Sequence, residues 1–287
     1  MGIIDLHTHS TVSDGTYTPA GLAELASKNN IQAFALTDHD NIGGLAEAGI
    51  ASKNFGVEFI PGMEVTMNFH GRKIHVITLG FSSDEKGFQE LYKKIRANKE
   101  GKMDDLVKGL QKQGIPITLE MVKSHSVGNI DRYAVMRCLV SLNIEKKIQT
   151  LWEKYIDPIV AELGLPENIY PEEAFPILHQ AGAIVSLAHF HKKIGLKGFS
   201  REEQADAIRE LHSYGLDAIE QWYPSYSDDD MTFIKQISEE LHLISTGGTD
   251  FHGLNRPEVD MGSGIRGNIS IPYSVAEELF HHINRRY

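Results

Sequence analysis

The chain has 287 residues, of which 41% are hydrophobic and 23% are charged, so it can bury a sizeable core and wholesale disorder is excluded. Its formal net charge of −11, with histidines neutral, argues against a surface that tracks long nucleic acid backbones. The single cysteine, Cys138, excludes intrachain disulfides and a thiolate zinc cage, and no stretch reaches the roughly 18 apolar residues that cross a bilayer.

Short β-branched or apolar runs alternate with longer amphipathic segments, which is typical of βα units around a parallel sheet. The chain begins MGIIDLHTHS, without a basic segment and a long apolar run, so we expect no secretory signal and a cytoplasmic location. A helix is predicted after the first strand, with Thr18 as N-cap and Pro19 at the first helical position. The predicted strands are Ile3–Leu6, Ala33–Thr37, Glu58–Ile60 continuing to Met63–Thr66, Ile74–Leu79, Ala183–Ala188, Ala218–Gln221 and Leu243–Ser245.

This alternation stops between Arg96 and Pro171, where the sequence contains helix-like stretches and predicts no strand. We therefore expect a discontinuous α/β domain made of residues 1–97 and 171–287, with a helical insertion at residues 98–170. The acidic triplet Asp228–Asp230 is predicted to be a solvated loop or a helix start, not a site.

Histidines and acids gather within the predicted strands or at their ends. His7 and His9, and likewise Asp250 and His252, are two residues apart, so both side chains of each pair point to one side of an extended segment. In parallel α/β barrels the loops after the strands share one face, so distant positions would converge there. The metal-capable residues are His7, His9, Asp14, His39, Glu64, His75, His189, Asp250 and His252.

A mixture of imidazoles and carboxylates favours zinc, manganese or iron over magnesium or calcium, which prefer oxygen ligands. Glu64 can bridge two ions, because each carboxylate oxygen can bind one. Each motif alone has an ordinary explanation: His75 as a core histidine, and Asp14 as a turn residue before Gly15. Burying all nine groups together without metal would be costly, so their joint occurrence favours a metal cluster.

The segments DLHTHSTVSDG, LTDHD, PGMEV, the AH at 188–189 and GTDFHG, together with His75, resemble the polymerase and histidinol phosphatase (PHP) superfamily in order and spacing. The helical segment between the fourth and fifth strands resembles the branch of 3′,5′-nucleoside bisphosphate phosphatases and 5′-to-3′ exoribonucleases. The resemblance implies a distorted seven-stranded TIM-like barrel with a helical insertion domain and two to three divalent ions. By this resemblance the first ion would be held by His7, His9, Glu64 and Asp250, the second by Glu64, His75 and His189, and the third by Asp14, His39 and His252.

We accordingly expect a hydrolase of phosphoric esters in which a metal-activated hydroxide attacks in line, without a covalent enzyme intermediate. The catalytic candidates are His189, His191 and Asp250, and either histidine or a metal-bound water could protonate the leaving group. The insertion is expected to cap and bind the substrate, since guanidinium groups suit phosphate. The substrate-binding candidates are Arg132, Arg137, His125, Asn129 and Lys99.

The expected substrate is a phosphomonoester of a small nucleotide, such as a nucleoside 3′,5′-bisphosphate. Three alternatives stay open: a 5′-to-3′ exoribonuclease on short 5′-phosphorylated RNA, a histidinol-phosphate phosphatase, and a non-catalytic metal-binding accessory module. The acidic balance of the chain argues against long DNA but not against a few nucleotides. We expect no membrane partner.

Overall fold

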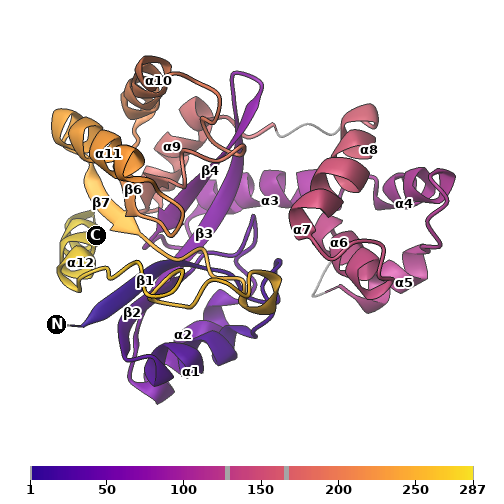
Figure 1. Ribbon diagram of the computed structural model, residues 1–287, viewed down its shortest axis with the longest axis horizontal. Coiled ribbons are helices and arrows are strands. Elements are labelled where there is room, and N and C mark those ends of the chain that lie inside the picture. Colours follow the sequence, from indigo (N-terminus) through magenta and orange to yellow (C-terminus); the bar gives the residue numbers. More distant parts are fainter. Residues whose placement is uncertain (1, 127–129, 165–167, 287) are drawn as a thin grey trace. The chain divides into compact units, whose positions relative to one another are not determined.

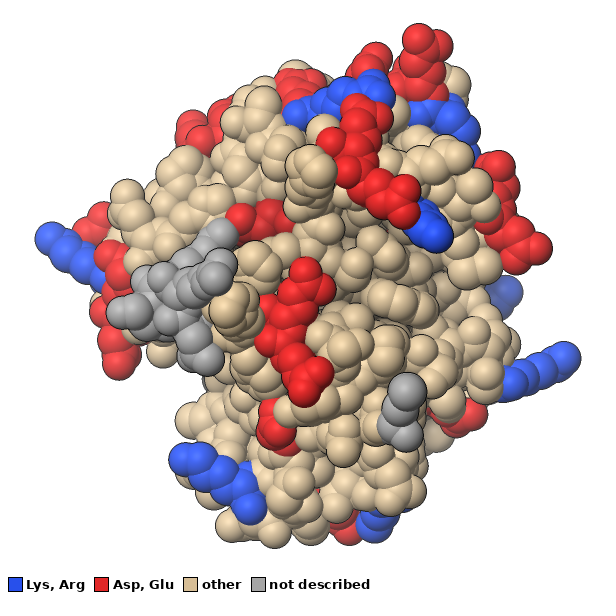
Figure 2. Space-filling model, turned by 90° about the vertical axis from the view of Figure 1, so that its left-hand side faces the viewer, with Lys and Arg blue, Asp and Glu red and all other residues tan. Residues whose placement is uncertain are grey.

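The computed structural model describes residues 2–126, 130–164 and 168–286. The chain divides into two compact units: unit 1 comprises Met1–Tyr92 and Ile169–Tyr287, and unit 2 comprises Lys93–Asn168. None of the described helices combines the length and the apolar character needed to cross a membrane. Acidic side chains are spread over the face drawn in Figure 2, with basic side chains mostly near its margins, in keeping with the net charge of −11.

Unit 1 contains a seven-stranded sheet whose strands pair in chain order from β1 to β7. All seven predicted strands are present, but the predicted parallel pattern is wrong at β4, which runs antiparallel to both β3 and β5. Gly71, at φ +78°, forms the turn between β3 and β4, so the chain folds straight back as a hairpin instead of crossing over through a helix. The strands are β1 (Ile3–Thr8), β2 (Ile31–Leu36), β3 (Glu58–Phe69), β4 (Arg72–Leu79), β5 (Ile184–Leu187), β6 (Ala218–Trp222) and β7 (Ile244–Gly247).

The helices of unit 1 pack on this sheet, with α1 and α2 side by side (Figure 1). α1 begins as predicted, with the Thr18 hydroxyl accepting from the Gly21 N–H. The Asp228–Asp230 triplet is confirmed as a helix start, because Ser227 caps α11 and Asp230 completes a capping box. The helices are α1 (Pro19–Lys28), α2 (Leu45–Phe55), α3 (Lys86–Glu100, continuing into unit 2), α9 (Pro171–Gln180), α10 (Arg201–Tyr214), α11 (Asp228–Leu241), the 3₁₀ turn η2 (Gly253–Asn255) and α12 (Ser274–Arg286).

The sheet curves around a common core. Ile4 of β1, Ile77 of β4 and Ala218 of β6 belong to one buried cluster with Leu279 of α12. In a flat sheet β1 and β7 would lie about 29 Å apart, at roughly 4.8 Å per strand, so a shared core requires strong curvature. The seven-stranded α/β architecture is thus confirmed. Closure by strand pairing is not present in the described part of the chain, where a single bridge between Thr8 and Phe251 joins β1 to the segment after β7.

Unit 2 is helical, with no strand among its described residues. It has its own buried core, to which α4 contributes Leu110, α6 contributes Leu139 and the π-helical turn η1 contributes Ile156. Asp131 caps α6 by accepting from the Ala134 N–H. Its elements after α3 are α4 (Met103–Lys112), α5 (Leu119–Ser124), α6 (Arg132–Ser141), α7 (Ile148–Thr150), η1 (Leu151–Ile156) and α8 (Asp157–Glu162).

Candidate metal centre

The nine metal-capable residues all lie in unit 1, and all nine are buried. They come from β1, β3 and β4 and from the loops that follow β1, β2, β5 and β7, so the curved sheet brings them to one end. Three groups have ligand atoms within 4.8 Å of one another and could each hold an ion: His7, His9, Glu64 and Asp250; His9, Asp14, His39 and His252; and His39, Glu64 and His75.

The carboxylate of Glu64 lies at the centre of the cluster and is completely buried. Its two oxygens face different imidazoles, as expected for a carboxylate that bridges two ions. Oε1 lies 2.8 Å from His75 Nδ1 and 2.9 Å from His189 Nε2. Oε2 lies 3.3 Å from His7 Nε2, 3.2 Å from His9 Nε2 and 2.9 Å from His39 Nδ1.

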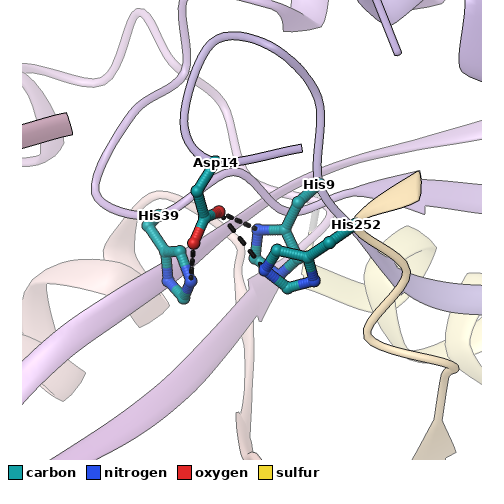
Figure 3. Close-up of side chains that lie close together, drawn as sticks. All are labelled: His9, Asp14, His39 and His252. Carbon is teal, nitrogen blue, oxygen red and sulfur yellow. Dashed lines mark ion pairs between the residues drawn. The ribbon is translucent and has the colours of Figure 1, made fainter. Parts of the chain in front are cut away.

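A second carboxylate, Asp14, faces three imidazoles in the group drawn in Figure 3. Asp14 Oδ1 lies 3.3 Å from His252 Nε2 and 3.8 Å from His9 Nδ1, and Oδ2 lies 3.6 Å from His39 Nε2. His9 and His39 therefore stand between Asp14 and Glu64, with one ring nitrogen toward each carboxylate. The arrangement suits closely spaced ions better than a single one.

Several buried ligand atoms have no hydrogen-bond partner among the described residues: His7 Nε2, both ring nitrogens of His9, and Glu64 Oε2. Buried polar atoms are nearly always paired, so atoms that converge without partners fit a cation between them. A mixed imidazole and carboxylate set is also the chemistry that zinc, manganese and iron accept. The residues present therefore fit the metal cluster expected from the sequence.

The charges in the cluster hold one another in place. Burial alone would lower the pKa of His39, but the carboxylates of Glu64 and Asp14 outweigh burial and raise it to about 9. Burial alone would raise the pKa of Glu64, but the imidazoles of His75, His39 and His7 hold it well below its usual range. Without a cation, protonated histidine thus supplies the positive charge that Glu64 requires, so metal binding competes with protons.

The turn after β1, which carries Asp14, is fixed by a buried carboxylate that sequence reasoning missed. Asp38 Oδ1 accepts from the Ser10 N–H at 2.8 Å and from the Ser13 hydroxyl at 2.6 Å. Asp38 Oδ2 accepts from the Ser10 hydroxyl at 2.6 Å. The signal lay in LTDHD, where two acids flank His39 directly after a buried strand.

Two further buried carboxylates hold ligand-bearing segments. Asp40 accepts from the N–H and hydroxyl of Thr66, at 2.9 and 2.8 Å, and so fixes β3 close to Glu64. Asp5 accepts from the N–H and hydroxyl of Thr249, at 2.9 and 2.6 Å, and so fastens the loop after β7 to β1. These groups support the candidate ligands without belonging to the three ligand groups.

Backbone geometry at two candidate ligands is unusual. His189 and Asp250 have φ values of +22° and +53°, which residues other than glycine rarely adopt. Each lies within three residues of the end of a strand, and strained backbone of this kind occurs most often at functional sites. Gly248, just before Asp250, lies so close to β1 that a Cβ there would come within 2.3 Å of the His7 Cβ.

Asp250 presents its two oxygens to different surroundings. Oδ1 lies 3.4 Å from His7 Nε2 and 3.2 Å from His9 Nε2, on the side of the candidate ions. Oδ2 accepts from Tyr223 Oη at 2.6 Å, from Arg256 Nη1 at 2.6 Å and from Lys192 Nζ at 3.1 Å. Burial alone would raise the pKa of Asp250, but Lys192 and Arg256 hold it well below its usual range.

Sequence reasoning missed Lys192 and Arg256, because neither belongs to a ligand motif. Their only signal was a cation close behind His189 and another close behind His252. Their side chains keep 34% and 21% of their surface exposed, so they are accessible at the edge of the cluster. Both carry positive charge beside the candidate ligands.

The two histidines expected to donate a proton are both neutral near pH 7. Burial lowers the pKa of His189 to about 3 and that of His191 to about 4. A neutral imidazole is the form that binds metal, which suits the position of His189 against Glu64. His191 lies outside the three ligand groups, with its Nε2 2.9 Å from the Ser225 hydroxyl.

The predicted substrate-binding residues all fall in unit 2, where Arg132, Arg137 and His125 have hydrogen-bond partners inside the unit. Arg132 is buried and donates to the carbonyl oxygen of Asn98. Arg137 Nε donates to the carbonyl oxygen of His125 at 2.8 Å, and Lys99 is also buried. The fifth candidate, Asn129, lies outside the described residues. Their role in substrate binding stays a prediction.

Comparisons with known proteins agree with this geometry. The family model described as PHP domain matches residues 5–164. A 5′-3′ exoribonuclease of Haemophilus influenzae is 29% identical over 86% of this chain and 89% of its own. A 3′,5′-nucleoside bisphosphate phosphatase of Chromobacterium violaceum is 29% identical over 91% of each chain. The solved structure of a candidate metal-dependent phosphoesterase from Bifidobacterium adolescentis shares the fold, with a TM-score of 0.81 at 23% identity over 97% of this chain and 96% of that one.

Proposed function

Because the chain belongs to the PHP family of metal-dependent phosphoesterases, we propose that it hydrolyses a phosphomonoester of a small nucleotide, such as a nucleoside 3′,5′-bisphosphate. The observation that carries the proposal is the convergence of nine imidazole and carboxylate side chains, Glu64 among them, in which several individual ligand atoms have no hydrogen-bond partner among the described residues. The 3′,5′-nucleoside bisphosphate phosphatase of C. violaceum supports the choice of substrate.

The ligand groups support two or three divalent ions, with manganese, zinc or iron favoured by the imidazoles. Glu64 would bridge two of them through its separate oxygens. The proposed assignment is His7, His9, Glu64 and Asp250 for the first ion, Glu64, His75 and His189 for the second, and Asp14, His39 and His252 for the third, with His9 also close to the third group.

When bound, the ions supply Lewis-acid chemistry, activating water and neutralising charge on the phosphoryl oxygens. The residues of the chain orient and shield this reaction. Tyr223 is buried beside Asp250, so the pKa of its hydroxyl lies well above its usual value, and Oη keeps its proton in order to donate to Asp250 Oδ2. With Oδ2 engaged in this way, Oδ1 of Asp250 is directed toward His7 and His9.

Lys192 and Arg256 are the groups we propose to contact the substrate phosphate. Both are cationic, partly exposed, and converge on Asp250 Oδ2. Together these two cations carry more positive charge than the one carboxylate of Asp250 balances, so they could still attract an anion at the edge of the cluster. A phosphoryl oxygen would replace the carboxylate as their partner, and a guanidinium suits such an oxyanion.

A second candidate function is removal of nucleotides from the 5′ end of short RNA. It is favoured by the similarity to the H. influenzae exoribonuclease, over nearly the same share of the chain as the phosphatase. The acidic face in Figure 2 and the net charge of −11 fit a short oligonucleotide better than a long polymer.

The test is a comparison of phosphate and nucleotide release from three substrates in the presence of manganese: a nucleoside 3′,5′-bisphosphate, a short 5′-phosphorylated RNA and histidinol phosphate. We expect the bisphosphate to give the highest kcat/KM. Glu64→Gln should lose activity on all of them, since the amide nitrogen cannot bind an ion. Turnover that survives thorough chelation, or an unaffected Glu64→Gln variant, would rule out the proposed mechanism.

A further inference from the structure

Glu220, in the middle of β6, is a completely buried carboxylate that belongs to none of the three ligand groups. Both of its oxygens lie within hydrogen-bond distance of candidate ligands. Oε1 lies 2.8 Å from Nδ1 of His7, and Oε2 accepts from the backbone N–H of His189 at 2.7 Å. We propose that Glu220 is a positioning residue that orients His7 and His189 for metal binding and thereby sets the metal affinity of the cluster. This inference rests on the proposed metal-dependent function.

The contact with His7 decides which ring nitrogen is available to an ion. As a carboxylate, Glu220 would accept hydrogen bonds at both oxygens, and Nδ1 of His7 would then carry the proton that lies between the two groups. The lone pair is then on Nε2, which points to Glu64 Oε2 at 3.3 Å and Asp250 Oδ1 at 3.4 Å. In the other neutral tautomer the proton on Nε2 would face these two carboxylates and block the position of the ion. Glu220 therefore selects the tautomer that can bind metal.

The contact with His189 fixes a strained backbone. His189 has φ +22°, and its N–H is held by Glu220 Oε2. This conformation directs its Nε2 to within 2.9 Å of Glu64 Oε1. His7 faces the other oxygen of Glu64, so one buried carboxylate orients ligands on both sides of the bridging residue. Loss of Glu220 should therefore weaken more than one ion position.

Glu220→Gln is the informative change, because glutamine keeps the shape but offers one acceptor and one donor. If its oxygen accepts from the His189 N–H, its NH₂ faces His7 Nδ1 and forces the proton onto Nε2. We expect manganese affinity to fall by about 10- to 100-fold, as is usual when such a partner of a ligating histidine is lost. The melting temperature of the metal-free variant should stay close to that of the wild type.

Asp217→Asn is a matched control. Asp217 Oδ2 also contacts a histidine ring, His179 Nε2 at 2.8 Å, and a backbone N–H, that of Val185 at 2.9 Å. His179 belongs to none of the described ligand groups, so this variant should bind manganese as the wild type does. Equal loss of affinity in both variants would overturn the proposal, because any carboxylate that contacts a histidine ring would then have the same effect. Wild-type affinity in Glu220→Gln would also overturn it.

Two further measurements keep the test decisive. If Glu220→Gln does not fold, the ¹⁵N resonances of the His7 ring in the zinc-loaded wild type report the tautomer directly: a proton on Nδ1 supports the proposal, and a proton on Nε2 overturns it. If Glu220→Gln folds, saturating manganese should restore its KM for substrate, which a general structural defect would not allow. If the wild type shows no phosphatase activity but Glu220→Gln still binds manganese more weakly than the wild type, the proposed function fails and the role of Glu220 stands.

Discussion

Replacing Gly248 with alanine tests how closely the end of β7 must approach β1 for the candidate ligands to meet. A Cβ at this position would lie 2.3 Å from the Cβ and 2.4 Å from the backbone nitrogen of His7. Contacts this short are not tolerated, and the neighbouring atoms are backbone or directly attached to it, so they cannot rotate away. Either β1 or the segment carrying Asp250 has to move.

Overpacking of this kind costs about 1–3 kcal/mol. At about 2–4 °C per kcal/mol for a domain of this size, the melting temperature should fall by ~2–12 °C. Because the displaced segment carries Asp250, manganese affinity should fall as well. Thermal unfolding of the metal-free variant and a manganese titration measure the two effects separately.

Gly49→Ala is the matched control, since the same methyl group is added in α2, 3.4 Å from the Phe59 ring, an ordinary van der Waals contact. Within a helix this change should stabilise the protein by about 0.5–1 kcal/mol and leave metal binding unchanged. A Gly248→Ala variant with the melting temperature and manganese affinity of the wild type would refute the reasoning, because the close approach of β7 to His7 would then be unnecessary.

Three other predictions follow from the site. Lys192→Met and Arg256→Gln should each raise KM for the phosphate substrate about tenfold or more with metal content unchanged, whereas Lys197→Met should not; steady-state kinetics with metal analysis decide this. The pKa of His39 is raised from 6.5 to about 9, so its stabilising charge is fully present below pH 6.5 and is lost as pH rises through 9. The melting temperature of the metal-free wild type should therefore fall between these pH values, and that of His39→Gln should fall less. Manganese affinity should rise over the same range, because metal and protons compete. Asp38→Asn should loosen the turn that carries a ligand of the third ion and lower the metal-to-protein ratio, measured by elemental analysis.

The sequence pattern predicted those parts of the fold that depend on local signals, such as apolar runs and helix caps. The first two strands are short apolar runs next to helix signals; they were predicted at Ile3–Leu6 and Ala33–Thr37 and lie at Ile3–Thr8 and Ile31–Leu36. The direction of β4 was missed, because a strand pattern is the same in either direction and only the turn at Gly71 decides it. Closure of the barrel depends on the twist of the whole sheet, which no local pattern specifies.

Within the site, the sequence predicted side chains that carry a recognisable motif and missed those that act from a neighbouring strand. His7 was expected from HTH, whereas Glu220 looks like any acid in a strand until its oxygens are seen on His7 and His189. Arg132 was expected at the substrate because a guanidinium suits phosphate, and that role stays a prediction. A buried guanidinium that donates to the Asn98 carbonyl could not be foreseen, because burial depends on packing within unit 2.

The join between β1 and the segment after β7 has a mechanical consequence. Neighbouring strands of the sheet are joined by several paired residues, whereas among the described residues β1 is joined to the segment after β7 by one bridge, between Thr8 and Phe251. An ion bound by His7 and Asp250 would span this seam and tie β1 to the loop after β7. Chelation should then loosen this seam, so that its backbone amides exchange their hydrogens with solvent before those of the rest of the sheet. A bound ion would thus add to the hydrogen bonds by which Asp5 already holds the loop after β7 to β1.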